Sequence, residues 1–255
     1  MIFDTHAHYD DEDFDKDRNE LLNQMQASGI GRIVNIGASM KTSAITVDLT
    51  RQYDFVYGAV GVHPNEVGAM KTSDLDQLKE WSALEKIVAI GEIGLDYHYD
   101  EPSKEIQFQW FEVQLELARQ VGLPVVIHSR DAAKDTVDRM KALHAGDIGG
   151  VVHCYSYTKE LAREFLNMDF YFGIGGVLTF PNAKKLREAV EYIPIEKIVL
   201  ETDSPYLAPV PNRGKRNSSL NLPYVAEVLA QVKGMTREEV EAVTFENAEK
   251  LYRMR

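Results

Sequence analysis

Two histidines one residue apart, His6 and His8, end an apolar run at the start of the chain. In a β-strand, side chains two positions apart point to the same face, so both imidazoles would face one space. Neutral imidazole is a common ligand for divalent transition metals. The pair is equally compatible with a strand that merely ends in two polar residues. Whether later strands end in the same way decides between the two interpretations.

Later apolar runs do end in polar side chains. These residues are His63, Glu92, His128, His153 and Asp203. A lone histidine at a strand end is more often a hydrogen-bonded structural residue. Several ionisable groups gathered at one place, however, would be costly to bury without partners. Their convergence would therefore favour a bound cation.

The candidate metal ligands are His6, His8, Glu92, His128, His153 and Asp203. Four imidazoles and two carboxylates suffice for two divalent ions with positions left open for water. Glu92 is central in strand order, and a carboxylate can bridge two metals. This mixture of nitrogen and oxygen ligands does not choose among Zn, Mn and Mg.

The elements that would position these residues alternate regularly along the chain. Short apolar runs lie at residues 2–8, 32–37, 55–62, 87–92, 124–128, 150–153, 170–175 and 197–201. Helical patterns lie at residues 21–30, 108–117, 137–143, 161–166, 222–232 and 240–251. Continuous apolar strands that alternate with helices are typical of buried parallel sheets.

Eight strand–helix units in about 250 residues predict an α/β protein, a single (β/α)8 TIM-type barrel over residues 1–255. Its active-site rim would carry all the polar residues named above. The alternative is an open doubly wound sheet, which would need a nucleotide-binding glycine motif after the first strand. Residues 36–39 do not provide one. The irregular segment 205–223 is expected to be a functional or mobile loop.

Composition limits the possible functions. A net charge of -12 argues against a generally basic surface that coats nucleic acid, although bound cations could still reverse the field in one cleft. Cys154 is the only cysteine, so no internal disulfide can form, which fits a reducing compartment. Neither a secretory signal nor an apolar run long enough to span a bilayer is evident. We therefore expect a cytoplasmic protein without membrane contact; no sequence feature chooses an oligomeric state.

Several stretches together resemble one family. They are Asp4-Thr5-His6-Ala7-His8, Gly61-Val62-His63-Pro64, Gly91-Glu92-Ile93-Gly94-Leu95-Asp96-Tyr97, His128-Ser129-Arg130-Asp131-Ala132, His153-Cys154-Tyr155, Glu201-Thr202-Asp203-Ser204-Pro205-Tyr206-Leu207 and Arg213-Gly214-Lys215-Arg216-Asn217. With them the sequence resembles the TatD family of metal-dependent deoxyribonucleases, within the amidohydrolase-like barrels.

The resemblance implies a hydrolase that cleaves DNA phosphodiester bonds by a metal-activated water, with exonuclease character and single-stranded DNA or DNA ends as substrate. It implies one ion at His6, His8, Glu92 and Asp203, and a second at Glu92, His128 and His153. Glu92 and Asp203 are the expected catalytic residues. Asp203 would orient or deprotonate the water, or act purely as a ligand.

Candidate substrate contacts follow from position and charge. The resemblance implies that His63 faces substrate. Arg130 lies two residues after His128, and a guanidinium suits bidentate phosphate contacts. Lys215 and Arg216 belong to a basic loop after the eighth strand, which we expect to contact phosphate rather than form only a solvated surface. Tyr206 could stack on an unpaired base or pack in its loop.

Two other functions remain open from the sequence. A barrel with the same metals could hydrolyse a small ester, lactone or amide, and a non-catalytic barrel could use metal for structure alone. The family pattern also weakens after Asn217, where Ser218 and Ser219 replace the usual Glu-Pro. Segment 217–223 would border the substrate, so this departure bears on nucleic-acid preference.

Overall fold

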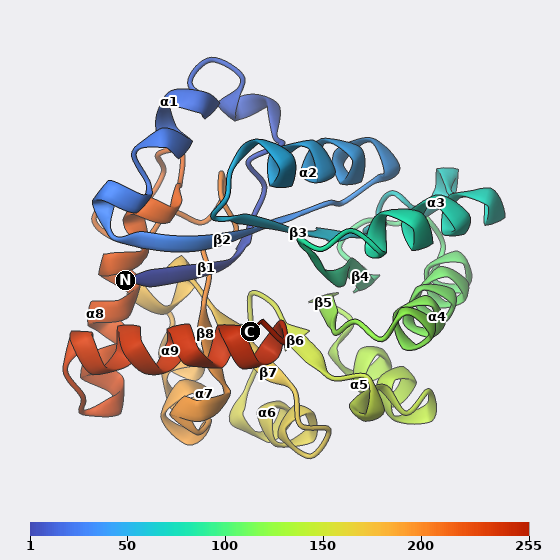
Figure 1. The fold of residues 1–255 in the computed structure, drawn as a ribbon. Helices are drawn as coiled ribbons and strands as arrows, with labels where there is room; N and C mark the ends of the chain where they lie inside the picture. The colour runs from blue at the N-terminus through green and yellow to red at the C-terminus, as the bar shows by residue number, and fades with distance from the viewer. Residues whose placement is uncertain (255) are drawn as a thin grey trace.

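Eight parallel strands, each hydrogen-bonded to the next in chain order, form the centre of the molecule (Figure 1). This computed structural model describes residues 1–254. The strands are β1 (Ile2–Ala7), β2 (Ile30–Ile36), β3 (Val56–Val60), β4 (Ile87–Asp96), β5 (Val125–Arg130), β6 (Gly150–Val152), β7 (Tyr171–Ile174) and β8 (Ile198–Leu200). Beyond β8, the Asp203 amide donates to the His6 carbonyl at 2.9 Å, and the His8 amide donates to the Ser204 carbonyl at 2.8 Å. These bonds join the first strand to the last, so the fold is the predicted (β/α)8 barrel and not an open sheet.

Helices follow the strands along the chain and surround them (Figure 1). They are α1 (Arg18–Asn23), α2 (Met40–Gln52), α3 (Thr72–Ser82), α4 (Lys104–Val121), α5 (Ala133–Ala142), α6 (Lys159–Leu166), α7 (Lys184–Tyr192), α8 (Leu222–Lys233) and α9 (Arg237–Leu251). Ser39 is the N-cap of helix α2, because its side chain accepts a hydrogen bond from the Thr42 amide. None of the helices in the described part of the chain is long and apolar enough to cross a membrane.

Apolar side chains fill both sides of the strand layer. One buried cluster lies between strands and surrounding helices; a smaller one combines strand residues such as Phe3, Val34 and Val126 with the end of α9. Tyr252, just after α9, donates a hydrogen bond to the Thr5 carbonyl at 2.8 Å. The continuous apolar strands of the sequence reflect this burial on two sides.

Several predicted boundaries differ from the structure, and helices α2, α3 and α7 have no counterpart among the helical patterns of the sequence. The expected strand over residues 87–92 continues to Asp96, because Gly94 and Asp96 keep pairing with His128 and Arg130 of β5. The expected helix over residues 21–30 ends earlier, at Asn23. A short 3-10 turn over residues 26–28 follows. Gly29, which ends this turn, has a left-handed backbone conformation with φ 87° and leads the chain into β2. The predicted domain, residues 1–255, extends one residue beyond the described part of the chain.

Candidate metal centre at the strand ends

His6 lies near the end of β1 and His8 directly after it. Their Nε2 atoms are 3.1 Å apart, so both rings face the same point as predicted for alternate strand positions. His6 is fully buried, whereas the His8 side chain is partly open. His8 Nδ1 is 2.9 Å from the Ile36 carbonyl, to which it can donate only as an N–H. This contact fixes the ring so that Nε2 of His8 faces the centre.

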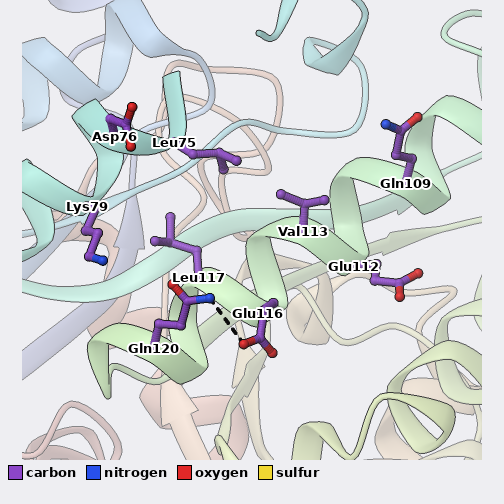
Figure 2. Close-up of a pocket in the computed structure, with 9 residues that line it drawn as sticks. All are labelled: Leu75, Asp76, Lys79, Gln109, Glu112, Val113, Glu116, Leu117 and Gln120. Carbon is purple, nitrogen blue, oxygen red and sulfur yellow. Dashed lines mark hydrogen bonds between the residues drawn. The ribbon is translucent and has the colours of Figure 1, made fainter. Parts of the chain in front are cut away.

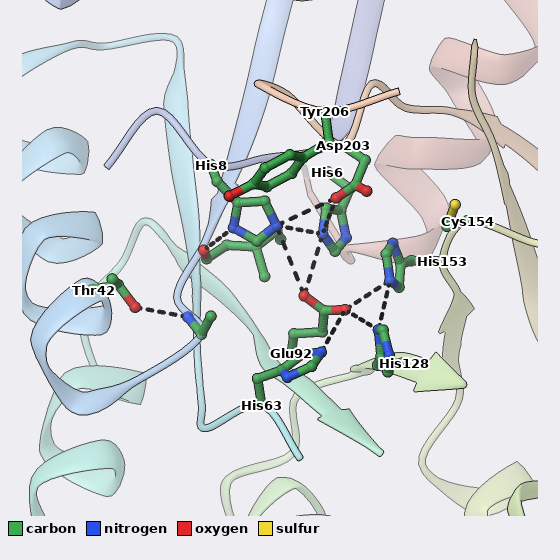
Figure 3. Close-up of polar contacts among 12 residues, drawn as sticks. His6, His8, Thr42, His63, Glu92, His128, His153, Cys154, Asp203 and Tyr206 are labelled. Carbon is green, nitrogen blue, oxygen red and sulfur yellow. Dashed lines mark hydrogen bonds and ion pairs between the residues drawn. The ribbon is translucent and has the colours of Figure 1, made fainter. Parts of the chain in front are cut away.

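Glu92 and Asp203 bring carboxylate oxygens to the same point (Figure 3). Oδ1 of Asp203 is 3.4 Å from His8 Nε2 and 3.7 Å from His6 Nε2. Oε2 of Glu92 is 3.5 Å from His6 Nε2 and 3.8 Å from His8 Nε2. Two ring nitrogens and two carboxylates from β1, β4 and the segment after β8 therefore converge.

The other oxygen of Glu92 faces a second group of imidazoles. Oε1 is 2.7 Å from His128 Nδ1 and 2.7 Å from His153 Nε2, and these two nitrogens are 3.2 Å apart. His128 lies on β5 and His153 directly after β6. In Figure 3 the Glu92 carboxylate stands between the two groups, with one oxygen directed to each. This is the arrangement that a bridging carboxylate requires.

The electrostatics of the cluster favour negative carboxylates. Burial opposes ionisation of Glu92, but His153, His6 and His128 bring the pKa of Glu92 well below its usual range. Burial likewise opposes ionisation of Asp203, but its contact with His8 lowers the pKa of Asp203. Burial would lower the pKa of His8, yet Asp203 and Glu92 raise it to about 9. Against the effect of burial, Asp96 and Glu92 raise the pKa of His128, and Glu92 and Glu201 raise that of His153. Ring protons therefore balance the two ionised carboxylates, and divalent cations could take the place of these protons.

The donor set fits divalent metal ions. His6, His8 and Asp203 each offer one atom within 4.8 Å of the others, and so do His63, Glu92 and His128. Among the described residues, the ion-pair partners of Glu92 and Asp203 are all histidines, so no lysine or arginine neutralises them. Nitrogen and oxygen ligands of this kind suit Zn, Mn or Mg.

The cluster lies at the bottom of an open cleft of about 1130 Å³. Its walls come from the loops that follow several strands, as expected for the active-site rim of this fold. The cleft carries acidic side chains, among them Asp11 and Glu66, but also the cations Arg18, Lys41 and Arg130. Arg18 is occupied by the carbonyl oxygens of Asp10 and Asp11 and by Asp15. Lys41 and Arg130 are therefore the cations best placed to meet an anionic ligand.

Three predicted substrate contacts do line this cleft. His63 Nε2 is 3.9 Å from Glu92 Oε1, while its Nδ1 accepts a hydrogen bond from the Asn65 amide at 3.1 Å. Burial, reinforced by His128, lowers the pKa of His63 to about 3, so this ring is neutral. Arg130 is exposed at the end of β5. Tyr206 is 53% exposed and donates a hydrogen bond to Asp11 at 2.8 Å.

The other two predicted substrate contacts, Lys215 and Arg216, do not lie at the cleft. Arg216 donates two hydrogen bonds to the Asp17 carboxylate, at 2.7 and 2.5 Å, and a third to the Asp13 carbonyl. Its guanidinium also lies over the ring of Phe14. Neither Lys215 nor Arg216 lines the cleft. This geometry favours a structural role for Arg216, because its guanidinium is already occupied.

Four residues at the site were not singled out from the sequence. Asp96 and Glu201 are buried carboxylates beside His128 and His153, and Lys41 and Tyr99 line the cleft. Strand alternation could have indicated Asp96, since positions 92, 94 and 96 share one face of β4. Lys41 lies at the start of a helix, where no strand pattern applies.

Cys154 follows the candidate ligand His153 directly in the chain and lies at the same cleft. It is only half-buried and lines the cleft. Strand β6 ends at Val152, and Cys154 has a φ of 47°, so alternation no longer directs its side chain away from that of His153. Its amide donates to Glu201 Oε1 at 2.5 Å.

A second hollow, of about 490 Å³, lies outside the barrel between α3 and α4 (Figure 2). It is lined by side chains such as Leu75, Lys79, Val113 and Glu116, and none of its lining residues is a histidine or a candidate metal ligand. Of these two hollows, the cleft at the strand ends is the one lined by candidate metal ligands.

Comparisons with known proteins agree with this geometry. The family model described as TatD related DNase matches residues 3–253. The metal-dependent hydrolase YabD of Bacillus subtilis is 45% identical over 254 residues, covering 100% of both chains. The metal-dependent hydrolase YcfH of Escherichia coli is 35% identical, covering 99% of this chain and 96% of that protein.

Solved structures give the same result. The crystal structure of YjjV, a TatD homologue from Escherichia coli K12, has a TM-score of 0.93 at 29% identity, covering 100% of this chain and 98% of that chain. A TatD-family hydrolase from Entamoeba histolytica has a TM-score of 0.86 at 24% identity, covering 99% and 98% of the two chains. The chain described here therefore belongs to the TatD-related DNase family, whose matched bacterial relatives are metal-dependent hydrolases.

Proposed function

We propose that this protein is a divalent-metal-dependent phosphodiesterase that hydrolyses DNA, acting on single strands or on DNA ends with exonuclease character. The position of Glu92 carries the proposal: each of its oxygens faces a separate group of ligand atoms, at the bottom of an open cleft. The family to which the chain belongs supports a nucleic-acid substrate.

The proposed ligands divide between two ions that share Glu92. His6, His8 and Asp203 would hold one ion, and His128 and His153 the other. Such a pair, when bound, supplies positive charge for the attacking and leaving oxygens of a displacement and lowers the pKa of bound water.

Asp203 is the more accessible of the two carboxylates. Its side chain is 18% exposed, against 4% for Glu92, and it faces the cleft. The amide of Asp203 is fixed by the His6 carbonyl, which sets the carboxylate relative to β1. We assign to Asp203 the orientation, or the deprotonation, of the attacking water. Arg130 and Lys41 would hold phosphate groups of the substrate.

A nuclease assay tests the proposal. Single-stranded oligonucleotides labelled at either end would be incubated with Mg, Mn or Zn, beside small neutral esters, lactones and amides. We expect metal-dependent, stepwise shortening from one end. The Glu92→Ala variant should lose more than about a hundredfold in rate, because removing a bridging ligand disturbs both ions.

Glu188→Gln is the matched control, since Glu188 is exposed on α7 and pairs only with Lys184. Its rate should equal that of the unchanged protein. Metal-dependent turnover of an ester, lactone or amide without cleavage of any oligonucleotide would reject the nuclease proposal. Turnover of no substrate with any metal would indicate a non-catalytic barrel.

A further inference from the structure

His128 lies between two carboxylates from the same strand. Its Nδ1 is 2.7 Å from Oε1 of Glu92, and its Nε2 is 3.1 Å from Oδ2 of Asp96. A neutral imidazole carries one proton, so one ring nitrogen is a donor and the other an acceptor. An ionised carboxylate only accepts. Whichever carboxylate receives the N–H therefore decides which nitrogen keeps a free lone pair.

Asp96 is held in a fixed position from which it can accept the Nε2–H of His128. It is buried at the end of β4, and its Oδ1 accepts a hydrogen bond from the His98 amide at 2.9 Å. Its own backbone is bonded on both sides by Gln107 of α4, whose Oε1 accepts from the Asp96 amide while Nε2 donates to the Asp96 carbonyl, each at 2.9 Å. Asn65 Nδ2 donates to Oδ2 at 3.3 Å.

Among the described residues, no other proposed ligand has an equally direct hydrogen bond between its outer ring nitrogen and a carboxylate. Glu201 stands behind His153 in a similar position, but Oε1 of Glu201 is 3.7 Å from His153 Nδ1, which is longer than a hydrogen bond. His8 uses a backbone carbonyl instead. Asp96 is thus the carboxylate that directly hydrogen-bonds the outer nitrogen of a proposed ligand.

We propose that Asp96 is a positioning residue that sets the tautomer of His128. By accepting the Nε2 proton, it leaves the Nδ1 lone pair directed at Glu92 and His153, where the second ion is proposed to bind. This inference rests on the proposed metal-dependent function. Carboxylates that support metal-binding histidines in this way commonly contribute a factor of about ten to a hundred in metal affinity.

The variant Asp96→Asn reverses the tautomer without changing the size of the side chain. The His98 amide remains a donor, so the asparagine oxygen must stay at the Oδ1 position. The asparagine NH2 group then occupies the Oδ2 position and donates to His128 Nε2. Asn65 can turn its amide to accept, since its Oδ1 has no hydrogen-bond partner. The ring proton moves to Nδ1, where it blocks metal binding.

Two measurements follow the proton and the metal separately. Burial opposes protonation of His128, but Asp96 and Glu92 raise its pKa. The nitrogen-15 NMR shifts of the ring therefore distinguish the two tautomers when they are recorded without metal at a pH high enough to make the ring neutral. We expect Nε2–H in the unchanged protein and Nδ1–H in Asp96→Asn. Calorimetric titration with Mn or Zn alone should show affinity at one of two sites weakened by at least about tenfold in this variant.

The variant Asp96→Ala separates tautomer control from simple support. Alanine imposes no tautomer, so it should bind metal better than Asp96→Asn does, although asparagine fits the site better. If Asp96 had a purely structural role, Asp96→Asn should bind metal more tightly than Asp96→Ala. Asp135→Asn is the matched control: Asp135 accepts a hydrogen bond from Tyr97 nearby but does not contact the cluster. It should match the unchanged protein in both measurements.

An unchanged His128 tautomer and unchanged metal affinity in Asp96→Asn would overturn the inference while leaving the metal-dependent function intact. Failure of the unchanged protein to bind any divalent metal would instead overturn the proposed function, and the ligand role of His128 with it. The tautomer is read without metal or substrate, so the two failures are distinguishable.

Discussion

Each oxygen of the Glu92 carboxylate faces a different set of ring nitrogens, and this division sets the roles available to the other residues. Asp203 contacts only the His6 and His8 side of the centre, and it is open to the cleft. A carboxylate in that place can act on a water molecule as well as on a cation. Substitution can separate these two roles.

Asp203→Asn keeps an oxygen that can face the first metal position but removes the basic carboxylate. If Asp203 activates water, kcat should fall by at least about a hundredfold while metal affinity, measured by titration without substrate, changes much less. Equal losses in kcat and in metal affinity would identify Asp203 as a ligand alone. Full activity would remove it from the mechanism.

Arg130 and Arg216 provide a test of which cations meet DNA. Arg130 lines the cleft, whereas Arg216 is bonded to Asp17 and Asp13. We expect Arg130→Ala to weaken oligonucleotide binding and to reduce the slope of log affinity against log salt by about 0.7 to 1, the contribution of one phosphate contact. The measurement is fluorescence anisotropy over a series of salt concentrations.

The companion variant Arg216→Ala should leave that slope unchanged and lower the melting temperature instead, because it removes three hydrogen bonds that connect the loop after β8 to residues 13–17. A loss of salt dependence in Arg216→Ala, with normal stability, would restore the basic-loop prediction. The comparison therefore shows whether each arginine contacts the DNA or stabilises the fold.

At the level of elements, β4 contributes the most to the site. It presents Glu92 and Asp96 on one face, and the intervening Gly94 lets β5 approach closely. A Cβ at Gly94 would lie 1.9 Å from the His128 carbonyl oxygen, and the φ of Gly94 is +147°. The close approach holds His128 between the two carboxylates.

Gly94→Ala should therefore separate β4 from β5 at the metal centre. We expect overpacking to lower the free energy of unfolding by about 1–3 kcal/mol. The folded fraction of this variant should also bind metal more weakly. Gly122→Ala is the control, because Gly122 also has a positive φ, +72°, but a Cβ there meets no atom within 4 Å. Urea denaturation compares the two; equal stabilities would show that β5 can shift at little cost.

The whole molecule is a closed barrel whose ligands come from separate strands, so the native fold is what assembles the metal centre. His6 and Asp203 lie almost two hundred positions apart in the chain and meet because the segment after β8 bonds to β1. An unfolded chain would not hold these side chains together. Metal binding should therefore stabilise the folded state.

Metal removal tests this coupling. A ligand present at a hundred times its dissociation constant stabilises the native state by about 2.7 kcal/mol. For a chain of this size that corresponds to a rise in melting temperature of roughly 5–10 °C over a sample treated with a chelator. The Glu92→Ala variant should show a much smaller difference. Identical melting curves with and without metal in the unchanged protein would contradict a metal site on these residues.

The sequence by itself determined the barrel and the residues at its centre. Apolar runs that alternate with helices require a buried parallel sheet, and a closed parallel barrel gathers the ends of all its strands at one rim. For that reason His6, Glu92 and His128 could be expected to meet before any distance was known. Their meeting is now observed, whereas their binding of metal remains a prediction.

Only the tertiary structure decided which charged groups are already occupied. The contact between Asp96 and His128 depends on β4 continuing past its apolar run, and the contact between Arg216 and Asp17 joins two loops that are far apart in the sequence. Periodicity in a sequence reports which face a residue occupies within its own element. The partner of a side chain at the end of an element depends on how the loops pack, and that is settled by the folded molecule as a whole.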